Sequence, residues 1–249
     1  MPKIAWAALV AAFIVVATIA WRAPATLLSA RIAHVTGGRV TLSEARGTIW
    51  HGQGVLAAGD ARIPLDWRLH AIPLLRGEIA IDVAPGTLDA TTPRGRVVVD
   101  AHGARFSDFA LSVPAAAVAN AVSRWPQFDA AGAIDVTAEK LDWRPPAGSG
   151  TLIAVWRDAR IGLAGGEPIA LGEISLTLSV AEGRLGGPLR NRGGEFSLDG
   201  ELALQANGAG HLRAALQARH PDDARLAVLA LLGTREANRV VIDWQWAGS

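Results

Sequence analysis

The sequence of 249 residues contains no cysteine, which excludes disulfide bonds, thiolate nucleophiles, iron–sulfur clusters and zinc sites built on cysteine. It also lacks an excess of either charge. The formal net charge is +1, so there is no overall basic field of the kind that attracts nucleic acid. The 27 glycines and 13 prolines do not follow a collagen-like period and instead indicate many turns.

A long uncharged run occupies residues 4–21 (IAWAALVAAFIVVATIAW), with one basic residue on each side. As a helix, these 18 residues would span about 27 Å, which is close to the hydrocarbon thickness of a bilayer. A cleaved signal peptide is the alternative, but its apolar region usually has about 7–15 residues and ends in small residues. We therefore predict an uncleaved transmembrane anchor over residues 1–23. Its membrane contacts are assigned to Ile4, Trp6, Phe13 and Trp21.

The orientation of this anchor follows from its short N-terminal tail. Basic residues are nearly balanced between the two flanks, so charge counting alone does not decide it. A tail of three residues is easily kept in the cytoplasm while the rest is exported. We therefore expect residues 24–249 to lie outside the cytoplasm as one β-rich domain.

Alternating apolar and polar residues dominate the exported part. Residues 62–70, 173–180, 201–205 and 239–246 alternate strictly, as expected for antiparallel strands with one buried face. The strongest hairpin signal among the turns is Asn207-Gly208. The apolar parity changes between Ala138 and Leu141, which predicts a β-bulge near Glu139-Lys140. The predicted fold is mainly β, with an antiparallel, meandering and curled sheet.

Short helices are predicted at residues 24–35, 114–124 and 221–232, where proline begins an apolar or alanine-rich segment. Residues 144–150 (RPPAGSG) are the one linker-like segment, which could divide the domain into halves at 37–143 and 150–246. Two or three short helices cannot cover ten or more strands. The sheet must therefore curl or fold upon itself, or part of its apolar face must receive lipid or a partner protein.

Sequence patterns for catalysis are missing. The six histidines are scattered, and none has a second ligand at metal-binding spacing. Residues 52–57 match G-x-G-x-x-A, but this dinucleotide pattern requires a strand followed by a helix, and here a turn follows. We expect no enzyme and assign no catalytic, cofactor-binding or metal-binding residue. An anchored hydrolase is the remaining alternative, and it would require titratable groups clustered in one pocket.

Three strings in fixed order carry a family resemblance. They are residues 47–52 (GTIWHG), 65–69 (LDWRL) and 74–77 (LLRG), all following the apolar anchor. This arrangement resembles the type II secretion system protein N family, also called general secretion pathway protein N. The similarity continues through the strand ending at Trp156, Leu171-Gly172 and the glycine-rich segment at 188–200. The residues assigned to the family motif are Gly47, Thr48, Trp50, Gly52, Leu65, Trp67, Gly77, Trp156 and Gly172.

The resemblance implies an inner-membrane protein with its bulk in the periplasm. It would be an accessory subunit of the machine that exports folded proteins across the outer membrane. Its expected partners are other secretion subunits, in the inner-membrane platform or the secretin. The family is also similar to AsmA-like proteins, so the curled sheet is expected to be an AsmA-like groove or a sandwich. Lipid handling along this groove is the alternative function. The resemblance supplies no catalytic residues, and we interpret the motif residues as structural.

Overall fold

The structure is a computed structural model that describes residues 22–59, 61–87, 91–121, 128–163, 167–205, 207–220 and 225–248. The predicted anchor, with Ile4, Trp6, Phe13 and Trp21, lies outside these residues. In the part of the chain that is described, no helix is both long and apolar enough to cross a membrane.

The described residues form fourteen strands, all joined in one antiparallel sheet. The strands are β1 (Val40–Gly47), β2 (His51–Ala58), β3 (Ala61–His70), β4 (Ile79–Pro85), β5 (Arg94–Asp100), β6 (Gly103–Pro114), β7 (Phe128–Arg144), β8 (Ala147–Leu163), β9 (Ile169–Ala181), β10 (Arg184–Arg192), β11 (Phe196–Leu204), β12 (Gly210–Ala218), β13 (Thr234–Glu236) and β14 (Arg239–Trp246). They follow chain order except that β14 pairs with β12 and β13 lies outside it. The sheet is therefore an open meander, with β1 and β13 at its edges.

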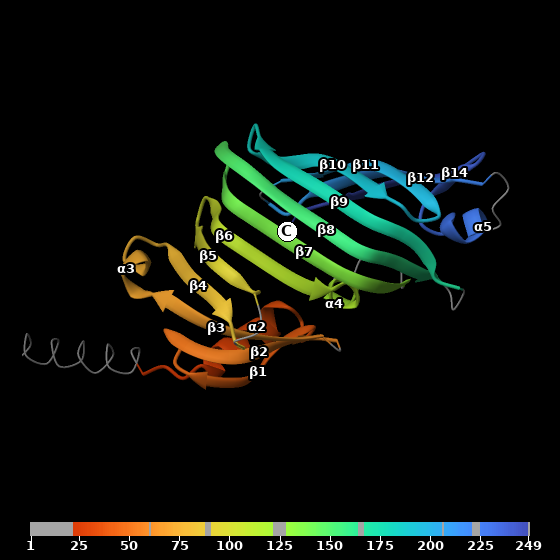
Figure 1. Cartoon of the computed structure of the whole chain (residues 1–249). Coiled ribbons are helices and arrows are strands. Elements are labelled where there is room, and N and C mark those ends of the chain that lie inside the picture. The colour runs from red at the N-terminus through yellow and green to blue at the C-terminus, as the bar shows by residue number, and fades with distance from the viewer. Residues whose placement is uncertain are drawn as a thin grey trace, which may run out of the picture.

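Four short helices accompany the sheet in the described residues: α2 (Thr26–Val35), α3 (Ala71–Leu74), α4 (Ala115–Ala121) and α5 (Arg225–Leu229). Figure 1 shows the sheet as a long, twisted and curved band, with α3 and α5 at opposite ends of it. The α3 end of the strands carries the turns at residues 48–50, 75–78, 101–102 and 145–146. The α5 end carries α4, α5 and the turn between β10 and β11.

Apolar side chains collect on one face, here called the inner face, as strict alternation requires. Around Trp67, for example, Leu65 and Trp67 are buried while Arg68 is exposed. Helix α2 covers the inner face of β1–β4, and α5 covers that of β11, β12 and β14. Helix α4 contacts β6 and β7 and also the distant β2, because the sheet curls around it.

Several sequence predictions can be compared with this fold. The sheet is mainly β, antiparallel and meandering, as predicted, and Asn207-Gly208 lies in the β11–β12 hairpin. The bulge is confirmed between Thr137 and Leu141, where β7 has one residue more than β8. The predicted linker at 144–150 differs from the structure. Arg144 pairs with Ala147, so this segment forms a tight hairpin turn with strand pairing on both sides.

Candidate functional site

The family string at residues 47–52 forms the turn between β1 and β2. Thr48 Oγ1 accepts hydrogen bonds from the amides of Trp50 and His51, both at 3.2 Å. Gly47 has φ of +92°, and a Cβ there would lie 2.6 Å from the backbone oxygen of His51. A Cβ at Gly52 would lie 2.6 Å from Cζ2 of Trp67. The two glycines are therefore required by close backbone and indole packing.

This turn also holds the start of the described chain. Pro24 forms an isolated antiparallel bridge with Thr48, and the Ile49 amide donates to the Ala23 carbonyl at 2.9 Å. The Ala25 amide donates to the Gly47 carbonyl at 3.2 Å. The segment that would continue from a membrane anchor is thus tied to the sheet by backbone hydrogen bonds.

Leu65 and Trp67 lie on β3 and pack beneath α2. Both are buried, in a cluster with Ala25 and Leu42. The indole Nε1 of Trp67 donates to the Ile49 carbonyl at 3.3 Å, so this side chain joins the cluster to the 48–50 turn. The family residues at 47–67 therefore come together as a packing unit at the α3 end of the sheet.

Gly77 ends the turn that follows α3. Its φ is +74°, which glycine adopts without the penalty that other residues carry. A Cβ at this position would meet nothing within 4 Å, so backbone conformation and not crowding accounts for the glycine. It shapes an exposed apolar turn that includes Leu74 and Leu75.

Trp156 and Gly172 lie in the other half of the sheet and do not join the first group. Trp156 packs against the cluster at the α5 end, and its Nε1 donates to the Ala131 carbonyl at 2.9 Å. Gly172 has φ of +77°, and a Cβ there would collide with the backbone of the β10–β11 turn. The structure thus places the motif residues in two separate packing units, with Gly77 outside both in the exposed turn.

Asn191 is a structural residue that the sequence analysis did not single out. Its Nδ2 donates to the carbonyls of Leu171 and Phe196, both at 2.8 Å, and its Oδ1 accepts from the Leu198 amide at 2.7 Å. The side chain fixes β9 and β11 on either side of β10. The glycine-rich segment at 188–200 contained the only signal that pointed to this region.

The central inner face lies between the surfaces covered by α2 and α5. Ala138, Leu141, Leu178 and Leu185 are buried there, and Trp143 is half-buried. The other half-buried members are Phe106, Phe109, Leu152, Leu176, Val180, Leu202 and Leu204. In the described part of the chain, no helix contributes a side chain to this cluster. This apolar cluster lies on the inner face of β6–β11, where the sheet curves (Figure 1), and it is called the central groove.

Charged residues on the outer face pair across neighbouring strands. Asp82 on β4 accepts hydrogen bonds from Arg96 on β5 at 2.5 and 3.0 Å and lies 2.7 Å from His70 Nε2 on β3. The Arg96 hydrogen bond, with help from His70, lowers the pKa of Asp82 to about 2. These side chains remain about one-third or more exposed, so the pairs are solvated cross-strand ion pairs that contribute little to stability.

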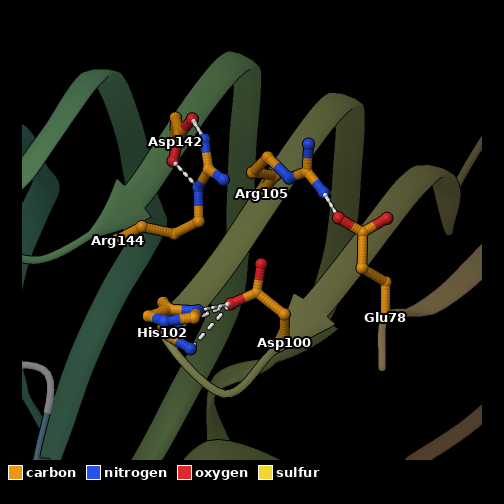
Figure 2. A network of polar contacts seen from close by, with 7 residues as sticks. Glu78, Asp100, His102, Arg105, Asp142 and Arg144 are labelled. Atoms are coloured by element: carbon orange, nitrogen blue, oxygen red, sulfur yellow. Dashed lines mark hydrogen bonds and ion pairs between the residues drawn. The ribbon is translucent and has the colours of Figure 1, made fainter. Parts of the chain in front are cut away.

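A second polar network lies at the α3 end of β4–β7 (Figure 2). Arg105 Nη2 donates to Glu78 Oε1 at 2.6 Å, and Arg144 Nε donates to Asp142 Oδ1 at 2.7 Å. The hydrogen bond from Arg144 lowers the pKa of Asp142. Asp100 caps its hairpin by accepting from the amides of His102 and Gly103. Among the described residues, no group of three His, Asp or Glu side chains is placed to hold a metal ion.

The comparisons with known proteins give one result. The family model described as "Type II secretion system (T2SS), protein N" matches residues 38–242, which include every described strand except the last four residues of β14. Searches of curated proteins and of solved structures found no match. Proteins of the matching family are structural components of the secretion system. Since the match covers most of the sequence, the chain belongs to the type II secretion system protein N family.

Proposed function

We propose that this accessory subunit of type II secretion is held in the inner membrane by residues 1–23 and presents its sheet to partner subunits in the periplasm. Family membership carries the secretion role. The location is supported by the uncharged run at residues 4–21 and by the way residues 23–25 are tied to the sheet immediately after it. The central groove is the surface we assign to partner contacts.

The groove suits a protein partner because it is apolar and lacks a covering helix among the described residues. Its aromatic side chains favour this use. Phe106 and Phe109 make an edge-to-face contact with centroids 5.4 Å apart, and Trp143 lies on the next strand. Aromatic residues set in an apolar surface are enriched at the energetically important centres of protein interfaces.

Deleting the gene is expected to lower the secretion of folded exoproteins and to leave them in the periplasm. Transport across the inner membrane should be unaffected, because another pathway carries it out. The measurement is the fraction of an exoprotein in the medium, with cleavage of its signal peptide as the control. A chain whose residues 1–23 are replaced by a cleaved signal peptide then tests the anchor separately. Normal secretion in a strain without a substitute copy would contradict the proposed function.

Lipid handling is the second candidate, since the same groove could shield acyl chains. Leu152 on the groove face of β8 and its neighbour Ile153 on the outer face provide a matched pair. If the groove holds lipid, Leu152→Glu should reduce the phospholipid that native mass spectrometry detects on the full-length chain, and Ile153→Glu should not. Equal lipid on both variants would mean that the lipid surrounds the anchor. Loss of recovered secretin or platform subunits with Leu152→Glu alone would favour the protein interface.

A further inference from the structure

Exposed apolar side chains are concentrated at one end of the sheet. Of the eight large apolar side chains that are exposed among the described residues, six lie at the α3 end. These six are Leu27, Ile72, Leu74, Leu75, Ile79 and Val99. Ile72 is 70% exposed and Leu75 is 88% exposed, at the tip of the turn formed by residues 71–79. A group of exposed apolar side chains on a protein surface marks a contact site for a membrane or for another protein.

The turn at 71–79 satisfies its own backbone groups. The amide of Leu75 donates to the Ile72 carbonyl at 3.1 Å, and the Gly77 amide donates to the Leu74 carbonyl at 3.0 Å. The amides of Arg76 and Glu78 both donate to the Pro73 carbonyl, at 2.9 and 3.0 Å. The free-energy cost of moving this turn from water into a bilayer is therefore lower, because four of its amides already have hydrogen-bond partners.

The same end of the sheet receives the chain from the predicted anchor. The Ala23 carbonyl accepts a hydrogen bond from the Ile49 amide. The carbonyl of Trp50, which follows Ile49 in the chain, accepts one from the Leu69 amide at 2.6 Å. Leu69 lies two residues before α3 begins. Only the 48–50 turn therefore separates Ala23 from the base of the exposed turn. In Figure 1 the described chain begins on the same side of the sheet as α3.

Charges around the turn fit a membrane surface with anionic headgroups. Arg22 and Arg76 are both exposed and can face lipid phosphates. Glu78 is the acidic residue at the base of the turn, and Arg105 neutralises it through a 2.6 Å ion pair (Figure 2). The turn thus carries an exposed arginine, a second exposed arginine lies at the start of the described chain, and the acidic neighbour of the turn is paired.

We propose that the turn at residues 71–79 inserts Ile72 and Leu75 into the headgroup region of the membrane that holds the anchor. A second attachment beside the anchor would fix the sheet with its α3 end on the lipid and its α5 end directed away from it. This inference rests on the anchoring part of the proposed function. It adds a lipid-contacting site outside the anchor and outside the central groove.

The absence of cysteine allows a direct test in the full-length chain. Single variants Leu75→Cys and Leu231→Cys carry an environment-sensitive fluorophore in vesicles of phosphatidylethanolamine and phosphatidylglycerol. Leu231 is also exposed, at 66%, but it follows α5 at the other end of the sheet. Brominated acyl chains are expected to quench most of the signal at position 75 and to leave the signal at position 231 unchanged. Both side chains are exposed in the folded chain, so neither substitution removes core packing.

An alkaline carbonate wash separates the two ways in which this inference can fail. If the chain stays in the vesicles and position 75 is no more quenched than position 231, the turn does not insert and the anchor stands. If the wash removes the chain, the anchoring proposal fails and this inference fails with it. A label at position 75 that is shielded in cells but unquenched in vesicles would assign the turn to a protein partner and overturn the lipid contact.

Discussion

Replacing Phe196 with alanine is expected to lower the free energy of unfolding by about 3–5 kcal/mol. Phe196 is completely buried, on the first residue of β11, and it belongs to the cluster that α5 closes. Leu226 and Leu229 of α5 and Val240 of β14 are equally buried in this cluster. The substitution would remove the largest of these side chains and leave a cavity that a paired strand cannot close.

Urea unfolding of the full-length chain in detergent, followed by tryptophan fluorescence, measures this effect. Leu231→Ala is the control, since Leu231 lies close to the same cluster in sequence but is 66% exposed. Its effect should be within about 0.5 kcal/mol, as for most surface substitutions. A Phe196→Ala chain as stable as the Leu231→Ala chain would mean that this cluster does not close the α5 end.

The loss of stability should also be local. Each strand pairs almost only with its neighbours in the chain, so the sheet resembles a one-dimensional array. In such an array a substitution destabilises mainly the strands next to it. The cluster around Phe196 and the cluster around Trp67 share no residue. Hydrogen exchange in the Phe196→Ala chain should therefore accelerate in β11, β12 and β14 and remain unchanged in β1–β4.

Much of this sheet could be predicted because alternation reports directly on which face of a strand is buried. Leu65 and Trp67 share the buried parity of β3, and the parity change near Glu139 marks the bulge in β7. A meander also needs little topological information, because consecutive strands are neighbours. The one exchange in order, between β13 and β14, follows a helix and involves a strand of only three residues.

Other features depend on contacts between residues that are far apart in the sequence, and the alternation of apolar and polar residues does not report such contacts. Three of the hydrogen bonds of Asn191 join β9 and β11 across β10, and an asparagine between two arginines gives no sign of them. The hairpin at Arg144 and Ala147 has the composition of a linker, so only strand pairing distinguishes the two. The turn after α3 carries a family string, but its exposure depends on which surfaces the sheet leaves uncovered.

Trp67→Ala is expected to destabilise the opposite end of the sheet by a similar amount, about 3–5 kcal/mol. The indole is 7% exposed, packs against α2 residues and Leu42, and bonds to the Ile49 carbonyl. Exchange should accelerate in β1–β4 and remain unchanged in β11–β14, which is the reverse of the Phe196→Ala pattern. Unchanged exchange in β1–β4 would contradict the role given to this residue.

Trp67→Phe separates the packing of the ring from its hydrogen bond. Phenylalanine retains most of the buried apolar surface but cannot donate to the Ile49 carbonyl, so a loss of about 0.5–1.5 kcal/mol is expected. Since the two clusters share no residue, the effects of Trp67→Ala and Phe196→Ala should add to within about 0.3–0.5 kcal/mol. A larger coupling would show that the central groove transmits strain between its ends, and a ligand bound there would then stabilise both.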